Sequence, residues 1–379
     1  MVVGRGRVKF LIYFFEVHKI MSDVVYYPPE TRVMPLTLIR RERLLPTPGK
    51  VMVNMNDRVQ ALQTVGQTEV TGEVRIINIA RMLRVPPAKA ARFAKVKEGD
   101  DVKQGSVLAA RGLLGGTRAT SPVDGVVSRI DQNAGRILIR VVTKPFDLTA
   151  YLPGVVTNVM ASRGVVIETT GALIQGTVGF GGESFGVMHV IANESTDVLR
   201  AKSIDVAAHG AVIVGGSWID ESALQQALQL QVRGIIAGSM EGRLLELARS
   251  MPFPIILTEG LGKLPMARPI FKLLQSQNGR EASMSGITRT RWGVTRPEII
   301  IPLPTDSKPA LPPTVGTLLT TSLRVRVVRG SHQGEVGLVL SLPDQPRRIE
   351  TGARVYGAEV TLDTSGKMFV PLTNLEVLR

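Results

Sequence analysis

Residues 325–340 read VRVVRGSHQGEVGLVL, and this stretch defines the clearest local structure in the 379-residue chain. Its two apolar halves are rich in valine, which favours β-strands. The turn between them and the start of the second half carry glycines at positions 330, 334 and 337. Glycine is favoured where φ is positive or where two backbones come close. The stretch therefore predicts two strands joined by a glycine-rich turn.

The spacing V-x-V-V-x-G-x-x-x-G-x-x-G-x-V in this stretch resembles the KOW motif of small SH3-like barrels in ribosomal proteins and transcription elongation factors. Further strands are expected at 353–361 and 367–371, so residues 317–379 are predicted to form an SH3-like (KOW) β barrel. If this barrel contacts RNA, the candidates near the turn are Arg326, Arg329, His332 and Gln333. Such barrels also bind proteins, and residues 321–379 carry a net charge of only +2, so a protein partner stays open.

The overall composition is that of a globular protein, with 44% hydrophobic and 21% charged residues, and the length suggests two to four domains. The net charge of +14 favours an anionic partner, although it also fits simple solubility. Aromatic residues make up only 4%, too few for a stacking platform for single-stranded nucleic acid.

Cysteine is absent, which excludes disulfides and thiolate chemistry and fits a reducing cytoplasm. The four histidines are too far apart in sequence for a local metal motif. We therefore expect no cofactor, no metal, no membrane association and a cytoplasmic protein.

The N-terminal residues 1–20 begin with basic residues and continue into a short apolar run. That run is too short to span a membrane, and no small-residue cleavage site follows it. We expect residues 1–20 to be disordered or to precede the true start of the protein.

An internal repeat lies in the first part of the chain. VNMNDRVQALQTV at 53–65 aligns with VKEGDDVKQGSVL at 96–108 at a constant offset of 43 residues. Each copy is predicted to be a strand, a polar turn and a strand. Together with SPVDGVV at 121–127, the second copy resembles the barrel-sandwich hybrid scaffold of biotinyl and lipoyl domains. We expect a β-rich barrel-sandwich-like domain over 21–210.

Biotinyl and lipoyl domains carry a modifiable lysine a few residues before the S/A-P-x-x-G turn. Here that position is Leu114, and no lysine lies between Lys103 and Lys144. The resemblance is thus to the scaffold alone, without an attached cofactor.

A basic insert separates the two copies of the repeat. Residues 75–97 hold seven basic residues and no acidic one. A helical spacing of three would bring Lys89, Arg92 and Lys95 towards one face, beyond Arg81 and Arg84. The segment is predicted either to be a stripe that contacts nucleic-acid phosphates or to be a solvated helix face between two strands.

Residues 211–301 alternate between apolar strands and amphipathic helices, as parallel βαβ units do. We expect a small α/β (Rossmann-like) domain with strands at 211–214, 232–237 and 254–257. Its strand-end loops would meet at one edge of the sheet. They form a candidate ligand-binding cleft of Gly215, Gly216, Ser217, Gly238, Ser239, Glu259, Gly260 and Gly262. The alternative is that these glycines only make tight turns. A proline-rich linker is expected at 302–316.

The predicted fold class is therefore a multi-domain α+β protein with a barrel-sandwich-like domain, an α/β domain and a KOW barrel. The whole arrangement resembles uncharacterised bacterial KOW-containing proteins. The leading hypothesis is a non-catalytic binding protein for RNA or a ribonucleoprotein or transcription complex. The alternatives are a protein-assembly factor that binds no nucleic acid, and a ligand-binding or enzymatic α/β cleft.

Overall fold

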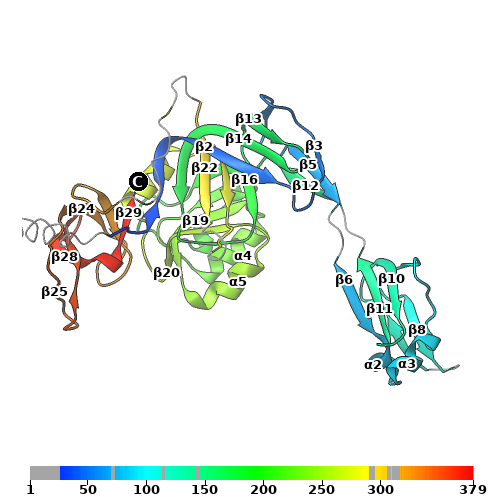
Figure 1. The fold of residues 1–379 in the computed structure, drawn as a ribbon. Coiled ribbons are helices and arrows are strands. Elements are labelled where there is room, and N and C mark those ends of the chain that lie inside the picture. The colour runs from blue at the N-terminus through cyan, green and yellow to red at the C-terminus, as the bar shows by residue number, and fades with distance from the viewer. Residues whose placement is uncertain are drawn as a thin grey trace, which may run out of the picture.

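The computed structural model describes residues 26–69, 73–112, 116–141, 145–289, 295–304, 309, 316 and 318–378. The protein is mostly β-strand, arranged in several sheets, with a smaller share of helix (Figure 1). No helix in this part of the chain combines the length and apolarity needed to cross a lipid bilayer. The expectations for residues 1–20 and for Leu114 lie outside the described residues, as does most of the predicted linker.

The largest sheet of the described chain has twelve strands and runs through the body of the protein. Its main path is β15 (Val178–Phe180), β20 (Ile255–Leu261), β19 (Gly234–Met240), β17 (Val212–Val214), β16 (Glu183–Val190), β21 (Glu281–Ser285), β22 (Glu298–Pro302), β14 (Gly164–Gln175), β13 (Gly154–Met160) and β4 (Arg58–Val59). Two further strands flank it, β18 (Trp218–Ile219) beside β19 and β2 (Val33–Leu44) beside β14.

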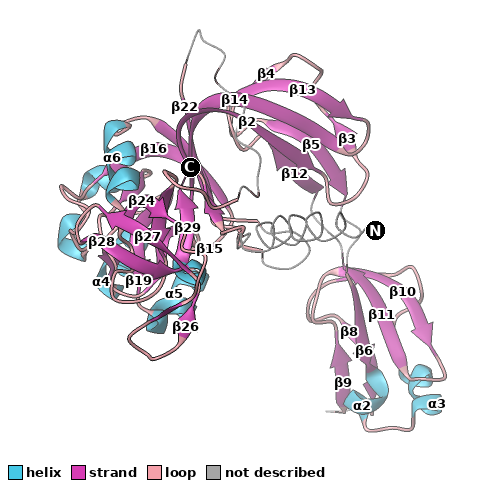
Figure 2. Ribbon diagram, turned by 60° about the vertical axis from the view of Figure 1, so that its left-hand side comes forward, coloured by secondary structure: helices cyan, strands magenta, loops and turns pink. Residues whose placement is uncertain are grey.

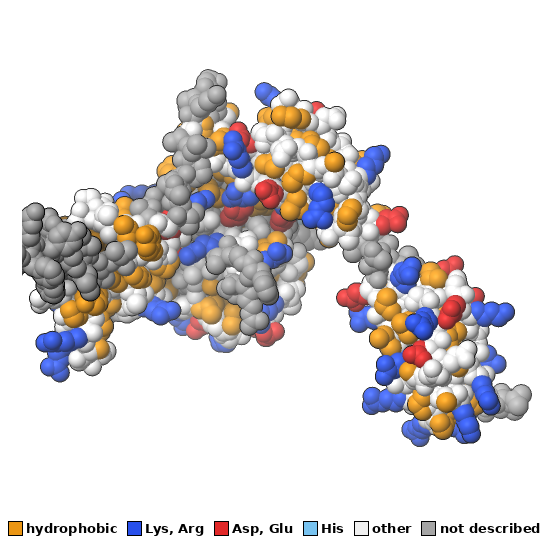
Figure 3. Space-filling view, in the orientation of Figure 1, with side chains coloured by type: hydrophobic (Ala, Val, Ile, Leu, Met, Phe, Trp, Pro, Cys, Tyr) orange, Lys and Arg blue, Asp and Glu red, His pale blue; other side chains and the backbone are white. Residues whose placement is uncertain are grey.

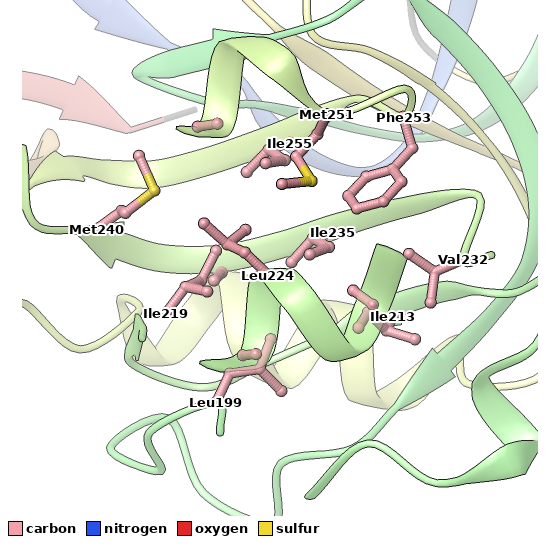
Figure 4. Packing of buried hydrophobic residues seen from close by; sticks show 14 of the residues in the cluster. Leu199, Ile213, Ile219, Leu224, Val232, Ile235, Met240, Met251, Phe253 and Ile255 are labelled. Atoms are coloured by element: carbon pink, nitrogen blue, oxygen red, sulfur yellow. The ribbon is translucent and has the colours of Figure 1, made fainter. Parts of the chain in front are cut away.

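The predicted parallel strands are present as β17, β19 and β20, which pair with one another in parallel. They are almost completely buried because helices cover both faces of this part of the sheet. Helices α4 (Glu221–Gln229) and α5 (Leu245–Ser250) pack on one face, and α6 (Arg268–Ser276) packs on the other. Figure 4 shows the first of these cores, in which Leu224 of α4 lies between Ile219 and Ile235.

Strand β16 differs from the sequence-based assignment. Residues 183–190 were expected in the N-terminal domain, but β16 pairs in parallel with β17 and so extends the α/β sheet. On its other side it pairs antiparallel with β21. A strand-like sequence with frequent glycines indicates that a strand is present, but it does not indicate which strand is its partner. Because β16 pairs with β17, the expected domain boundary at residue 210 does not coincide with a break in the sheet.

Residues 73–141, which we call the inserted module, have a hydrophobic core of their own. The module contains a four-stranded sheet, a two-stranded sheet and short helices. Its elements are β6 (Val74–Asn78), α2 (Ile79–Leu83), α3 (Pro87–Ala90), the 3₁₀ turn η1 (Ala91–Phe93), β7 (Asp101–Val102), β8 (Val107–Arg111), β9 (Thr117–Thr120), β10 (Gly125–Asp131) and β11 (Arg136–Val141).

The inserted module interrupts a second β unit with a separate core. This unit includes β2, β4, β13 and β14 of the large sheet and a small sheet of β3 (Lys50–Val51), β5 (Thr64–Glu69) and β12 (Pro145–Thr149). The interruption falls between β5 and β12, which pair with each other. Figures 1 and 2 both show the module projecting away from the body at this point.

The two copies of the sequence repeat make the same hydrogen bonds. In each copy the turn aspartate accepts a backbone N–H three residues earlier at 2.7 Å, and the residue before the aspartate has positive φ. Each turn then exchanges two backbone hydrogen bonds with a Gly-Val-Val segment. The bonds are Asn56 N to Val156 O, Val156 N to Asp57 O, Gly99 N to Val127 O and Val127 N to Asp100 O. Because residues 127 and 156 follow the second copy, one repeat unit is nested inside the other.

The C-terminal unit is a six-stranded sheet around its own core. The strand order is β1 (Glu30–Thr31), β29 (Leu375–Leu378), β23 (Arg324–Val327), β24 (Val336–Ser341), β27 (Gly357–Leu362) and β28 (Gly366–Pro371), with η5 (Leu372–Asn374) before β29. A hairpin of β25 (Arg347–Arg348) and β26 (Arg354–Val355) projects from it. The expected ring of strands is not closed by pairing, because among the described strands β28 and β1 remain at the two ends.

The glycine turn within residues 325–340 has the predicted geometry. Gly330 and Gly334 have φ of 102° and 91°, a region that side chains with a Cβ rarely adopt. Gly337 allows two backbones to come close, since a Cβ there would lie 2.3 Å from the Thr361 carbonyl oxygen on β27. Both reasons given for glycine in this stretch are therefore confirmed.

Candidate functional site

The inserted module carries a large share of the positive charge. Residues 73–141 contain thirteen basic and six acidic residues, a net charge of +7 out of +14 for the whole chain. The module is less than a fifth of the sequence, so the charge is concentrated rather than spread evenly.

The carboxylates of the module are used to hold its turns. Glu98, Asp100, Asp124 and Asp131 each accept at least one backbone N–H, at 2.7 to 3.1 Å. Within the described part of the module, an ion pair joins Arg75 to Glu73 at 2.9 Å. Most of its basic side chains therefore have no carboxylate partner among the described residues, and their charge is available to an external anion.

Five of these basic residues are the ones singled out from the sequence. Arg81 lies in α2, Arg84 is its C-cap, Lys89 lies in α3, Arg92 lies in η1, and Lys95 follows. All five are exposed, and within the described chain none of them forms an ion pair.

These five residues do not lie on one face of a single helix, as the spacing had predicted. Arg84 has left-handed φ of 54°, Pro86 and Pro87 start a new helix, and that helix ends at Ala90. The chain is already extended at Ala94, and the Lys95 N–H donates to the Leu108 carbonyl oxygen at 2.8 Å. Two short helices and a 3₁₀ turn thus present the charges, because the double proline prevents a continuous helix.

Sequence spacing did not suggest Arg111. Its Nη1 donates to the Arg84 carbonyl oxygen at 3.3 Å, so β8 brings a further exposed arginine to the end of α2. We call Arg81, Arg84, Lys89, Arg92, Lys95 and Arg111 the basic tip. Figures 1 and 2 place α2 and α3 at the end of the module remote from the body, and Figure 3 shows Lys and Arg side chains around that end.

The apolar side of the two helices fixes the basic tip. Asn78 caps α2 by accepting the Arg81 N–H at 2.9 Å. Ile79 and Leu83 are buried in the core of the module, which leaves the basic residues on the outer side. Gly135 allows the close packing, since a Cβ there would lie 2.7 Å from the Ala80 Cβ and 3.0 Å from the Ala90 Cβ.

In the C-terminal unit the four residues predicted to contact RNA differ in their exposure. Arg329 is exposed, and Arg329 and His332 line a groove of about 420 Å³ beside the glycine turn. The His332 Nδ1 lies 2.9 Å from a Glu335 oxygen, which orients the ring. Gln333 is half-buried in the same turn.

Arg326 is a correction to the expected RNA-contacting set, because its side chain is only 2% exposed. Its guanidinium forms ion pairs with Glu259 at 3.0 Å and with Glu376 at 2.5 Å, and it also donates to the Thr258 carbonyl oxygen. An arginine engaged in this way has no free face for a phosphate.

The same cluster accounts for Glu259, a candidate of the α/β cleft. Burial raises the pKa of Glu259, and the positive charge of Arg326 opposes this shift. Burial would also raise the pKa of Glu376, but Arg326 and then Arg296 hold it below its ordinary value. Two residues assigned from the sequence to separate sites therefore form one buried contact between the α/β sheet and the C-terminal unit.

The strand-end loops of the α/β sheet are mostly covered. Ser239 is completely buried, and its Oγ accepts the Leu264 N–H at 2.7 Å. Ser217 is also buried, and a Cβ at Gly238 would lie 2.6 Å from the Met266 backbone nitrogen. Gly260 and Gly262 have positive φ and turn the chain at this edge. The expected cleft of three loops is thus filled by the segment 262–267.

Gly215 and Gly216 are the two cleft candidates that do line a pocket. It has a volume of about 330 Å³ and lies at the end of β17. Asn193, Arg200 and Lys202 also line it. Among the described residues, no group of three or more His, Cys, Asp or Glu side chains is arranged to hold a metal ion.

No protein-family model matches this chain, and no curated protein sequence is significantly similar to it.

Proposed function

We propose that this chain is a non-catalytic binding protein whose basic tip binds the phosphate groups of RNA, alone or in a ribonucleoprotein or transcription complex. In this proposal the nested β units are barrel-sandwich-type scaffolds, the central unit is a Rossmann-like domain, and the C-terminal unit is a KOW-type barrel that is open between β1 and β28. The single observation that supports the function is the basic tip, with exposed and unpaired cationic side chains at the free end of a module of net charge +7.

Binding of this kind is driven by the release of cations from the nucleic acid. About six phosphate contacts would weaken the affinity for a duplex about 10³-fold between 50 and 200 mM salt. The residues 73–141 include a single aromatic side chain, Phe93. Base stacking at the tip is accordingly minor, and we expect little dependence on base sequence.

The experiment is a fluorescence-anisotropy titration of the full chain with a labelled RNA hairpin at several salt concentrations. The variant R84Q/K89Q/R92Q should bind more weakly, and the slope of log affinity against log salt should fall by about three. The matched control R163Q/R268Q/K272Q removes three exposed basic residues outside the module. Equal losses in the two variants would show that net charge alone matters and would reject the basic tip as the site.

A second candidate function is suggested by the pocket at Gly215 and Gly216. Arg200, Lys202 and one carboxylate, Asp197, line it, and Arg200 also lies 3.9 Å from Asp220. The pocket lies at the carboxyl end of a parallel strand, where ligands bind in open α/β sheets. A small anion is the ligand that this lining favours. Thermal stabilisation by inorganic phosphate or a nucleotide, lost in K202Q, is the test.

A further inference from the structure

The groove in the C-terminal unit runs along the edge of a strand. Its lining includes the consecutive residues 368–371 of β28. Side chains alternate between the two faces of a strand, so four residues in a row can line one groove only where it follows the strand edge. The turn after β23 forms one wall, and the β25–β26 hairpin forms the other.

That edge has no partner strand. Strand β28 pairs with β27 along its whole length, and no other strand of the described chain pairs with it. Alternate backbone N–H and C=O groups of β28 therefore point outward in the pattern that another extended chain can complete.

The walls of the groove carry unpaired positive charge. Arg329 on one wall and Arg348 on the other are exposed, and neither forms an ion pair within the described residues. Arg347 next to them is different, since it pairs with Glu359 at 3.0 Å and lies over the Phe369 ring. Glu350 is the carboxylate among the lining residues. Half-buried Met368 and Phe369 provide apolar contact between the two cationic walls, whereas the Val370 side chain is buried in the core of the unit.

We propose that β28 binds an extended acidic peptide segment of a partner protein, which adds to the sheet as a further strand. The free edge supplies alternating donors and acceptors that match a peptide backbone. Arg329 and Arg348 select acidic side chains, and the apolar lining accommodates the residues between them. This site is separate from the basic tip and does not depend on nucleic-acid binding.

The test uses the full chain and a fluorescein-labelled octapeptide of alternating glutamate and valine with blocked termini. We expect binding in fluorescence anisotropy at physiological salt and slowed hydrogen exchange at the backbone amides of residues 366–370. The same peptide with every backbone nitrogen methylated should bind at least about tenfold more weakly, because neither of its edges then carries the N–H donors that the ladder needs. A peptide of alternating lysine and valine should also bind at least about tenfold more weakly.

Protein variants separate this site from the proposed nucleic-acid function. R329E/R348E should lose the acidic peptide and keep RNA binding at the basic tip, while R268E/K272E on α6 should change neither. The proposal is overturned if the fully methylated peptide binds as well as the parent, if exchange at 366–370 is unchanged, or if the acidic peptide does not bind. Displacement of the peptide by an RNA hairpin from wild-type chain, but not from R84Q/K89Q/R92Q, would place the peptide on the tip and would also overturn it.

Discussion

Replacing Arg326 with methionine tests whether the buried ion cluster joins the C-terminal unit to the α/β sheet. Methionine keeps much of the apolar volume but leaves Glu259 without its cation, since the remaining partners of that carboxylate are the Ala267 N–H and the Thr258 hydroxyl. Glu376 retains Arg296 at 2.9 Å. Removing one partner from a buried ion pair costs about 3–5 kcal/mol of stability. We expect most of this cost to come from the unpaired charge of Glu259.

The protein has several cores, so one global unfolding transition is not expected. Native-state hydrogen exchange at β23 and β29 instead measures the free energy of opening at the junction itself. In R326M this free energy should fall by about 3–5 kcal/mol. The control R324M removes an exposed neighbour that pairs with Asp363 on the surface, and it should cost less than about 1 kcal/mol.

The double variant R326M/E259Q completes the test. Glutamine can still accept the Ala267 N–H but carries no charge, so the double variant should regain about 2 kcal/mol or more relative to R326M. The deficit of R326M should also shrink as the pH falls, because protonation of Glu259 removes the unpaired charge. The reasoning would be refuted if R326M opened as rarely as R324M, or if adding E259Q brought no recovery.

Three further predictions concern other parts of the structure. Gly135→Ala should destabilise the inserted module by about 1–3 kcal/mol, because the new methyl group would meet α2 and α3 and the φ of 61° disfavours alanine, as hydrogen exchange in β11 would show. Asp220→Ala should cost about 1 kcal/mol by removing the N-cap of α4, measured by exchange in that helix, with Gln225→Ala at an exposed position of the same helix as the control. Lys367, Ser341 and Arg347 lower the pKa of Glu359 to about 2. Its stabilising contribution is therefore complete above a pH of about 4.5 and is lost as the pH falls towards 2, which carboxyl NMR titration and loss of the effect in E359Q would check.

The local elements were predictable because their signals are local. Apolar runs ending in glycine mark β17, β19 and β20, and Asp220 marks the start of α4. The glycines at 330, 334 and 337 have the two geometries that only glycine tolerates. In each case a few neighbouring residues determine the backbone, so the sequence alone is sufficient.

The long-range contacts were not predictable in this way. Glu259 and Arg326 are 67 positions apart and meet only because two separately folded units pack together. Arg111 reaches Arg84 through the packing of β8 beside α2, which no spacing rule reports. Lys89, Arg92 and Lys95 have helical spacing, but the helix α3 begins at Pro87 and ends at Ala90, so it includes only the first of them.

Because one repeat unit is nested inside the other, the inserted module could be removed without disrupting the β unit that surrounds it. Glu69 and Pro145, on either side of the interruption, are register partners in the β5–β12 ladder, so the chain leaves and returns at neighbouring points. A tight hairpin turn between these two residues would restore an uninterrupted β unit around the core that the module does not share. The arrangement is what duplication of an ancestral unit, followed by insertion of one copy into a loop of the other, would leave behind. Such a β unit can gain, lose or exchange a charged inserted module without any change in its own hydrophobic core.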